Sequence, residues 1–571
     1  MRPLTLVLIM VLTSNIYLSA QNQIPIPESI TGTDFSLTLQ QGSVQFYDGQ
    51  VTNTMGVNGN ILGPTLIMQK GDFVNIEVLN QLDETTTIHW HGMHVSAGND
   101  GGPHNTIAPS ATWHPSFTVR DRAATYWYHP HLHEKTNEHV SKGIAGFIIV
   151  RDVDEAVLQL PRSYGVDDFP LVIQTKEFDA DNQIVTPTNS DNVVLVNATI
   201  HPELDLPAQV VRLRLLNGSS QRVFNLGLSN NTEFYQIASD GGLLNQPNAT
   251  TRLQLAPGER AELLLDLSGM TGSEIQLMSY ASEFPNGIYG ATNPGMMPMM
   301  TLNAYNPNPM NGNDFEILQI LVTEQTVNPI TTVPATLVTL NSIPESQADV
   351  TRSLIFTPET PGPNALNGKF LINGAGFDMN TINYTIPLDH TEIWSLTNQS
   401  PIAHPFHIHD VQFFVLDRDG VSPLASEAGR KDVILVKPME TLRFIAQFSD
   451  YADNEIPFMY HCHMLVHEDD GMMGQFLVVD ETIGLEETKN TSTRVLVSPN
   501  PVTTDKRTIQ STNPPLHIIE VYSVNGSLLD KTVFPNGTNQ ADLDISSIAS
   551  GVYIINASGA NWHNSQKLII K

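Results

Sequence analysis

The segment His461–Met472 constrains this chain more than any other part of it. Its second residue, Cys462, is the only cysteine among 571 residues; a histidine stands on either side of it, and His467 follows five residues later. A cysteine thiolate, imidazoles and a weak methionine thioether form the ligand set of a blue-copper electron-transfer site. Neighbouring side chains on a strand point to opposite faces. If Cys462 faces one metal, the two flanking histidines face another, so the segment predicts a connection between two metal centres.

Ten of the 19 histidines fall in four short clusters. The clusters are His89-Trp90-His91, His129-Pro130-His131, His404-Pro405-Phe406-His407-Ile408-His409 and the segment around Cys462. Each contains a His-x-His pair, which places two imidazoles on one face of a strand. One such pair occurs on a surface strand by chance, but four pairs in one chain predict metal binding. Outside the pairs stand His404, Cys462, His467 and Met472, which make one complete blue-copper set.

On these motifs the sequence resembles the three-domain multicopper oxidases, a family of laccases, bilirubin oxidases and cuprous oxidases, over about residues 35–482. The resemblance implies four copper ions per chain. It implies a type 1 copper bound by His404, Cys462 and His467, with Met472 as axial ligand. It implies a type 2 copper bound by His89 and His407. It also implies a type 3 copper pair bound by six further histidines, His91, His129, His131, His409, His461 and His463.

The resemblance also implies a reaction. A reducing substrate gives up one electron at a time at the type 1 copper, near His467, and O2 is reduced to water at the other three coppers. Asp100, before Gly101-Gly102, matches the acid that the family places near the type 2 copper, and a plain turn residue is the alternative. Glu468 is a candidate for a position between the sites or on a proton path, and a solvated acidic turn is the alternative. Oxygen reduction consumes protons, so both acids are candidate catalytic residues.

Three functions compete for this ligand set. The first is oxidation of phenols or aromatic amines, the second is oxidation of Cu(I), and the third is copper binding or electron transfer without oxidase turnover. Residues 284–310 carry no charge and include Met296, Met297 and Met299. Thioethers favour Cu(I), although a gap-filling apolar loop is the alternative. A pure carrier needs only the type 1 set, so the eight remaining histidines argue against the third function.

The composition favours a turn-rich all-β protein, with 15% charged residues, 38 Gly and 37 Pro. An alternating strand that ends in an asparagine recurs at Asn80, Asn217 and Asn398, and a ligand histidine follows nine residues after the first and the third. The recurrence predicts three cupredoxin-like Greek-key β-sandwich domains, at 21–155, 156–335 (with the methionine-rich loop) and 336–483. The middle copy has no such histidine and is interpreted as a spacer. The trinuclear site, which consists of the type 2 copper and the type 3 pair, would then form between the first and third domains.

The two ends of the chain predict export. Residues 1–20 are typical of a signal peptide, and no later run is apolar enough for a membrane span. After a polar linker at 484–494, residues 495–571 predict a small β-sandwich. This part resembles the C-terminal sorting domain of the type IX secretion system, which would carry the protein through the periplasm to the outer surface or the medium; a small binding module is the alternative. The net charge of -31 argues against nucleic acid as a partner, and we expect a monomer.

Overall fold

The computed structural model describes residues 21–480, 495–498, 506–511, 515–523, 527–559 and 562–571. The predicted signal peptide (1–20) and linker (484–494) lie outside these residues. The chain divides into two compact units, 1–480 and 481–571. Strands hold 46% of the residues and helices 6%, which confirms the all-β prediction. No helix in the described ranges is both long enough and apolar enough to cross a membrane.

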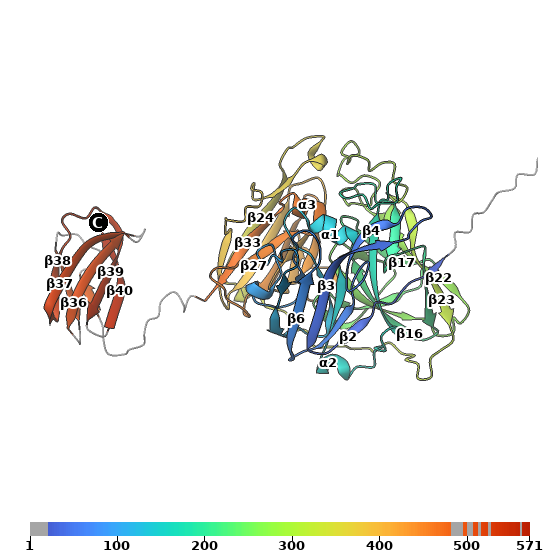
Figure 1. The fold of residues 1–571 in the computed structure, drawn as a ribbon, viewed down its shortest axis with the longest axis horizontal. Coiled ribbons are helices and arrows are strands. Elements are labelled where there is room, and N and C mark those ends of the chain that lie inside the picture. The colour runs from blue at the N-terminus through green and yellow to red at the C-terminus, as the bar shows by residue number, and fades with distance from the viewer. Residues whose placement is uncertain (1–20, 481–494, 499–505, 512–514, 524–526, 560–561) are drawn as a thin grey trace, which may run out of the picture. The chain divides into compact units, whose positions relative to one another are not determined.

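The first sandwich of the larger unit follows the N-terminus (blue in Figure 1). Its elements are β2 Ser29–Thr31, β3 Asp34–Val44, β4 Thr52–Val57, β5 Thr65–Gln69, β6 Phe73–Asn80, β7 His89–His91, η1 Ala97–Asn99, β8 Thr112–Trp113, β9 Ser116–Thr118, β10 Ala124–His129, α1 Thr136–Lys142, β11 Gly146–Arg151 and α2 Val153–Ala156. One sheet has the order β4-β3-β6-β8, with β9 also beside β6, and the other has the order β2-β5-β11-β10-β7. In β6, Val74, Ile76 and Val78 are buried while Phe73, Asn75 and Glu77 are exposed, as the period of two requires.

The middle sandwich is green in Figure 1. Its elements are β1 Asn22–Gln23, β12 Asp168–Lys176, β13 Val193–Val196, β14 Thr199–Ile200, β15 Pro202–Pro207, β16 Val210–Asn217, β17 Phe224–Leu228, β18 Phe234–Ser239, β19 Gly242–Thr250, β20 Leu253–Leu255, β21 Arg260–Asp266, β22 Glu274–Tyr280, η2 Ala281–Glu283 and β23 Asp314–Thr323. The sheets have the orders β1-β15-β23-β22-β17-β20 and β14-β13-β12-β16-β21-β18-β19. β1 pairs with β15, so the N-terminal residues expected in the first domain lie in a sheet of the middle one. Their backbone groups find partners there.

The third sandwich is yellow to orange in Figure 1. Its elements are η3 Glu345–Gln347, β24 Val350–Pro358, η4 Ala365–Asn367, β25 Phe370–Ile372, β26 Tyr384–Pro387, β27 Thr391–Asn398, β28 His404–Ile408, β29 Phe414–Arg418, η5 Ala425–Glu427, β30 Val433–Val436, β31 Thr441–Gln447, β32 Phe458–Cys462, α3 Leu465–Asp469 and β33 Met473–Val479. The sheets have the orders β25-β24-β27-β31-β29 and β26-β33-β32-β28-β30. Their inner faces form one apolar core, which includes Cys462 and Met472.

The C-terminal unit is a separate small sandwich. Its strands are β34 Val495–Ser498, β35 Lys506–Ser511, β36 Leu516–Ser523, β37 Leu528–Thr538, β38 Gln540–Asp544, β39 Gly551–Gly559 and β40 Trp562–Ile570. They form sheets of the orders β34-β35-β38 and β37-β36-β39-β40. Leu516, Ile519, Val521, Ile555 and Leu568 belong to its core. This unit therefore has an apolar core of its own.

The repeated asparagine has one structural role in all three larger sandwiches. Asn80, Asn217 and Asn398 are completely buried. The side-chain amide of each donates to two backbone carbonyls, one of them four or five residues later. The side-chain oxygen of each accepts the backbone N–H two residues later. One side chain thus satisfies three buried backbone groups at the strand end, which explains why the sequence repeats it.

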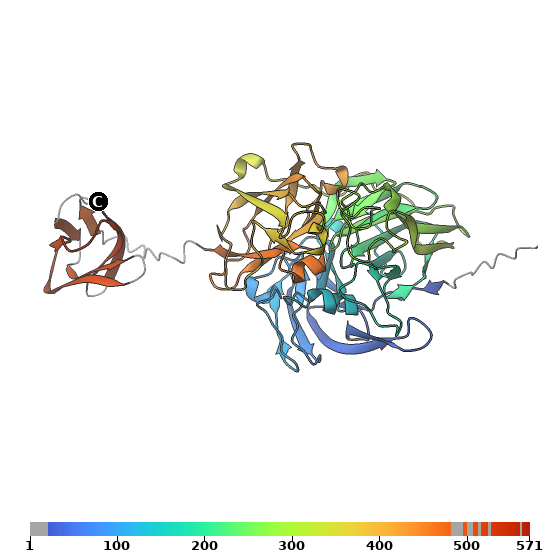
Figure 2. The same ribbon diagram turned by 90° about the horizontal axis from the view of Figure 1, so that it is seen from above.

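The three large sandwiches contact one another in pairs. The Thr125 hydroxyl of the first donates to Glu262 of the middle, Arg260 of the middle pairs with Asp432 of the third, and Asp100 of the first contacts His409 of the third. Figure 2 shows the blue, green and orange parts of the larger unit side by side, in agreement with these contacts. Side chains from all three therefore meet near one region.

Candidate metal centre

The four histidine clusters lie on two pairs of neighbouring strands. On β7 and β10, His89 stands opposite His129. On β28 and β32, His407 stands opposite His461. Each pair of strands belongs to the sheet of one sandwich, the first or the third. All ten clustered histidines are buried. Eight of them form sets that join the two sandwiches, whereas His404 and His467, the latter on α3, lie beside Cys462 in the third sandwich.

Eight of these histidines form two triads and a pair. The first triad is His91, His129 and His463; the second is His131, His409 and His461; and the pair is His89 and His407, which also lies near His409. In the first triad, Nδ1 of His91 is 3.2 Å from Nε2 of His129. In the second, Nε2 of His131 is 3.1 Å from Nε2 of His461. Every set combines a residue of the first sandwich with one of the third, so each depends on the contact between them.

Backbone and carboxylate groups fix the orientation of the imidazoles that bridge the sandwiches. Nδ1 of His89 is 2.9 Å from the carbonyl oxygen of Asp100, and Nδ1 of His407 is 2.8 Å from that of Asp432. Nδ1 of His409 is 2.7 Å from the Asp100 carboxylate. The Nε2 atoms of these three histidines are buried and have no hydrogen-bond partner among the described residues. A donating Nδ1–H leaves the Nε2 lone pair free, which is the form that binds a metal.

Burial favours the neutral form of most of the clustered imidazoles. It is the largest cause that lowers the pKa of nine of the ten, and the neighbouring imidazoles lower most of these pKa values further. The pKa falls to about 3 for His463 and His467 and to about 4 for His409. A neutral imidazole is a metal ligand at neutral pH without first losing a proton. The buried, partly unpartnered nitrogen donors therefore fit copper ions.

The sulfur site lies inside the third sandwich. Sγ of Cys462 is 3.5 Å from Nδ1 of His404 and 3.6 Å from Nδ1 of His467. Met472 is completely buried in the same core, and its carbonyl accepts the Cys462 backbone N–H. Burial raises the pKa of the Cys462 thiol, so a metal cation is needed to hold it as a thiolate. Two imidazoles, one thiol and a nearby thioether fit the donor set of a type 1 copper.

Two residues that the sequence analysis did not identify complete the surroundings of the sulfur site. The Ser400 hydroxyl lies 2.7 Å from Nε2 of His404, so a His404 that binds through Nδ1 donates its N–H to that oxygen. The ring of Phe370 lies 4.7 Å from that of His404 and 4.6 Å from that of His467. The backbone N–H of Ser400 donates to the side-chain oxygen of Asn398. The strand-Asn-turn repeat was visible in the sequence, but the contact with His404 was not.

The chain links the sulfur site directly to both triads. Cys462 points to the sulfur site, whereas its neighbours His461 and His463 belong to the second and the first triad. This division is the one predicted from alternation along a strand. Because His461 and His463 are the immediate neighbours of Cys462, one peptide bond on each side connects the cysteine to a histidine of each triad.

The two predicted acids are buried beside the histidines. Oδ2 of Asp100 is 2.7 Å from Nδ1 of His409, and its Oδ1 is 3.4 Å from Nδ1 of His89. Burial alone would raise the pKa of Asp100, but these two histidines outweigh it and hold the pKa well below its usual range. The two carboxylate oxygens of Glu468 lie 3.3 Å from Nδ1 of His131 and 3.3 Å from Nδ1 of His461. Glu468 is 1% exposed, so it is not part of a solvated turn.

The methionine-rich segment adjoins the sulfur site. Residues 284–310 contain no helix or strand, and Met296, Met297 and Met299 are 41%, 50% and 72% exposed. The Met296 backbone N–H donates to the carbonyl of Pro401, one residue after Ser400. Asn367 of η4, shortly before Phe370, hydrogen-bonds the segment at two points. Backbone contacts thus hold exposed thioethers beside the elements that surround His404 and His467.

Asp432 is a further buried acid that the sequence analysis missed. Its Oδ1 lies 3.1 Å from Nε2 of His91, and its side chain is completely buried. In the sequence it only precedes the apolar run Val433-Ile434-Leu435-Val436. A charged residue at the start of a buried strand was a weak signal, because many such residues are solvated.

Comparisons with known proteins agree with this geometry. Two multicopper oxidase family models match residues 38–155 and 344–482. A model of the secretion system C-terminal sorting domain matches residues 496–571, so the protein is exported to the cell surface or the medium.

Known relatives cover most of the chain. A protein named multicopper oxidase mco from Staphylococcus haemolyticus is 35% identical over 78% of this chain and 89% of its own length. A cell division protein FtsP from Photorhabdus laumondii is 32% identical over 80% of this chain and 93% of its own. The solved structure of a laccase-like multicopper oxidase, CueO, from Ochrobactrum sp. superposes with a TM-score of 0.70 at 33% identity, covering 80% of this chain and all of that one. Together with the buried histidine and cysteine sets, these matches show that the chain belongs to the multicopper oxidase family and is a copper-dependent oxidoreductase.

Proposed function

We propose that the enzyme binds four copper ions and couples one-electron oxidation of a reducing substrate to reduction of O2 to water. His404, Cys462, His467 and Met472 would hold the type 1 ion. His89 and His407 would hold the type 2 ion, and each triad would hold one ion of the type 3 pair. One observation carries this assignment. Buried imidazoles from two sandwiches meet in two triads and a pair, and the backbone of Cys462 connects the sulfur site to both triads.

Bound copper would supply the one-electron steps and the reduction of O2, and the protein would supply position and protons. The peptide that joins Cys462 to His461 and His463 gives electrons a short covalent route between the two regions. Phe370 covers the imidazoles of His404 and His467 and keeps water from them. The residual exposure of His467, 6%, makes it the ligand nearest to the surface, and we place the reducing substrate there.

Glu468 is the proposed source of protons, and both Asp100 and Glu468 are proposed to orient ligands. Asp100 orients one ligand of the pair and one of the second triad. Glu468 orients two ligands of the second triad, His131 and His461. Burial raises the pKa of Glu468 well above its usual range, which favours the protonated form of this carboxyl in the interior. Such a group suits a reaction that consumes protons away from bulk water.

Two substrate classes fit the site. Phenols and aromatic amines would bind over the His467 edge. Cu(I) would bind the exposed thioethers of Met296, Met297 and Met299, because soft sulfur donors favour Cu(I). The backbone contacts of their segment with Pro401 and Asn367 favour the metal-ion substrate. One structural relative, from Campylobacter jejuni, is described as a metallo-oxidase; it has a TM-score of 0.66 at 26% identity and covers 82% of this chain and 99% of that one.

A copper carrier without oxidase turnover is the weaker alternative. It requires only the sulfur site, and leaves eight buried histidines without a role. We also infer that the C-terminal unit directs the enzyme through the type IX secretion machinery after passage across the periplasm, and that the enzyme acts as a monomer.

Copper analysis combined with the visible spectrum of the copper-loaded protein tests this proposal. We expect about four coppers per chain and an intense blue thiolate band that bleaches with a reductant and returns in air. One copper, with a band that does not return in air, would establish the carrier. Four coppers without a blue band would show that Cys462 is not a ligand.

A further inference from the structure

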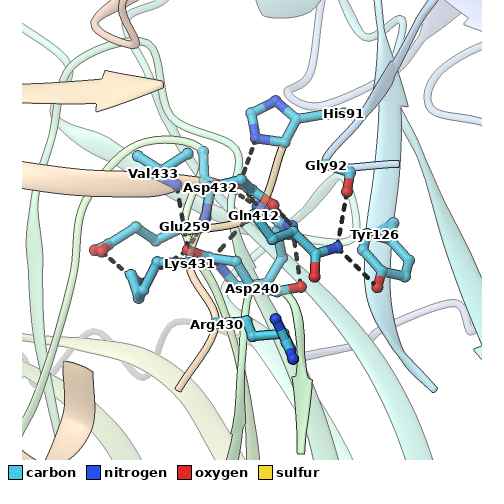
Figure 3. Close-up of polar contacts among 12 residues, drawn as sticks. His91, Gly92, Tyr126, Asp240, Glu259, Gln412, Arg430, Lys431, Asp432 and Val433 are labelled. Carbon is cyan, nitrogen blue, oxygen red and sulfur yellow. Dashed lines mark hydrogen bonds and ion pairs between the residues drawn. The ribbon is translucent and has the colours of Figure 1, made fainter. Parts of the chain in front are cut away.

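The middle sandwich contacts the trinuclear region through a network of buried charges. Figure 3 shows Asp432 beside His91, with Lys431, Glu259 and Asp240 grouped next to them. The Asp432 carboxylate contacts Nε2 of His91, and its carbonyl accepts the Nδ1–H of His407. One residue thus orients an imidazole of the first triad and one of the pair. The position of Asp432 therefore decides where both nitrogen donors point.

Arg260, at the start of β21 in the middle sandwich, holds Asp432 in place. Its Nη1 and Nη2 lie 2.6 and 2.5 Å from the two Asp432 carboxylate oxygens. Its Nε donates to the carbonyl of Thr125 in the first sandwich. This paired geometry fixes a carboxylate in both position and plane. A residue of the middle sandwich thereby ties the third sandwich to the first beside His91.

The network extends behind Arg260. Oδ1 of Asp240 accepts the backbone N–H of Arg260, and its Oδ2 accepts those of Asp432 and Val433. Nζ of Lys431 lies 2.7 Å from Glu259 and 3.0 Å from Asp240. Asp432 is thus held by Arg260 through its carboxylate and by Asp240 through its backbone, and Asp240 is itself paired with Lys431.

The middle sandwich touches a second ligand through Gly258. A Cβ atom at this position would lie 2.8 Å from Cγ and Nδ1 of the His463 ring, and the φ angle of Gly258 is +83°. Only glycine allows both this backbone conformation and this approach. His91 and His463 belong to the same triad, so the middle sandwich contacts this triad at two places, which are linked because Nη1 of Arg260 donates to the carbonyl of Gly258.

We propose that the middle sandwich is a structural part of the trinuclear site, in which Arg260 positions His91 through Asp432 and Gly258 sets the place of the His463 ring. It is thus more than the spacer expected from its lack of ligands. This inference rests on the proposed assignment of both histidines to the first triad. If the wild-type protein binds no copper at the first triad, the assignment of His91 and His463 as ligands is wrong. If the variants below keep full copper at this triad, only the role proposed for the middle sandwich is wrong.

The first test replaces Arg260. In Arg260→Met, we expect copper affinity at the first triad to fall by about 10- to 100-fold, the usual effect of losing a group that orients a ligand. The blue band of the sulfur site should remain. Site-by-site occupancy from anomalous diffraction at the copper edge and chelator competition on the holoenzyme give the readout. If Arg260→Met does not fold, the double variant Arg260→Met/Asp432→Asn can be measured in its place, because it also removes the carboxylate that would otherwise be left unpaired.

Arg214→Met is the matched control. Arg214 is equally buried and also comes from the middle sandwich, but its partners are Asp168, Glu262 and Thr125. It should lose stability and keep full copper at the first triad. Full occupancy in Arg260→Met, or an equal loss in Arg214→Met, would overturn the role of Arg260.

The second test adds one methyl group. Gly258→Ala should displace the His463 ring and lower occupancy of the first triad. Gly269→Ala is the control, since Gly269 has a similar φ of +75° but no atom of the described residues within 4 Å of the position that the added methyl group would take. The two glycines have similar φ angles, and only Gly258→Ala brings the added methyl group against His463. Equal copper content in the two would overturn the role of Gly258.

Discussion

His409 and Asp100 are 309 residues apart in sequence, yet Nδ1 of His409 lies 2.7 Å from Oδ2 of Asp100. The same carboxylate approaches Nδ1 of His89. One acid of the first sandwich thus orients a proposed ligand of the pair and one of the second triad. The contact can form only when the first and third sandwiches pack together, so assembly of the fold and of the metal centre are the same event.

Asp100→Asn should slow the oxygen half-reaction without removing copper. Asparagine keeps the size of the side chain but loses the charge that pairs with His409 and His89. We expect the blue band to bleach with substrate at the wild-type rate and to return in O2 about 100-fold more slowly. Stopped-flow absorption follows both phases. Wild-type reoxidation with all coppers bound would rule out this role.

Met472→Leu should raise the reduction potential of the type 1 site, because even a weak thioether donor stabilises Cu(II) more than a side chain that does not bind. A redox titration of the blue band measures the change. Met473→Leu is the control, since Met473 is the buried neighbour. If the potential shifts in Met473→Leu and not in Met472→Leu, the ligand is Met473 and not Met472.

Ser400→Ala should affect the same site through His404. Loss of the hydroxyl leaves a buried imidazole N–H without an acceptor, which costs about 1–3 kcal/mol. The acceptor also makes the imidazole a better donor, so its loss should raise the potential. Ser400→Thr retains the hydroxyl and should stay close to wild type. Equal potentials in Ser400→Ala and wild type would show that the hydrogen bond does not tune the copper.

Replacing Met296, Met297 and Met299 together by leucine separates the two substrate classes. Leucine keeps the apolar volume and removes the soft sulfur donors. We expect kcat/KM for Cu(I) to fall about tenfold, equivalent to about 1.4 kcal/mol, and phenol oxidation to be unchanged. Met270→Leu, at the edge of the middle core, controls for thioether loss elsewhere. Unchanged Cu(I) oxidation in the triple variant would remove the segment from the substrate site.

His94 should make stability depend on pH. Burial opposes its charge, but Asp121, 2.6 Å away, and Asp450 outweigh burial and raise the pKa of His94 to about 9. The folded protein holds this proton more tightly than the unfolded chain, whose histidine pKa is about 6.5. The stabilisation is complete below about pH 6.5 and disappears as the pH rises through about 9.

The side chain of His94 is 19% exposed, and the stabilisation is on the order of 3 kcal/mol. Denaturant unfolding of wild type and His94→Gln between pH 6 and pH 10 measures it. The difference between the two proteins should shrink as the pH rises. A difference that does not change with pH would show that His94 titrates normally in the folded state.

The sequence alone determined the fold class and the candidate ligands. Alternation along strands placed Cys462 and its two neighbouring histidines on opposite faces, and the structure has them there. The recurring asparagine marked three related strand ends, because each copy satisfies two equivalent backbone groups within five residues. These features are local, so they are readable from spacing.

Tertiary structure decided how the histidines are grouped and what holds them. Nothing in the spacing divides six histidines into two triads, because each triad joins strands of different sandwiches. Ser400, Arg260, Asp432 and Gly258 carry no local signal of their roles, since each acts on a histidine that only packing brings near it. The contact between Gly258 and His463 spans 205 residues of sequence. The sequence identified the candidate metal-donor residues. The packing of three sandwiches determined their positions, because the orientation of a side chain in a buried site depends on neighbours that are distant along the chain.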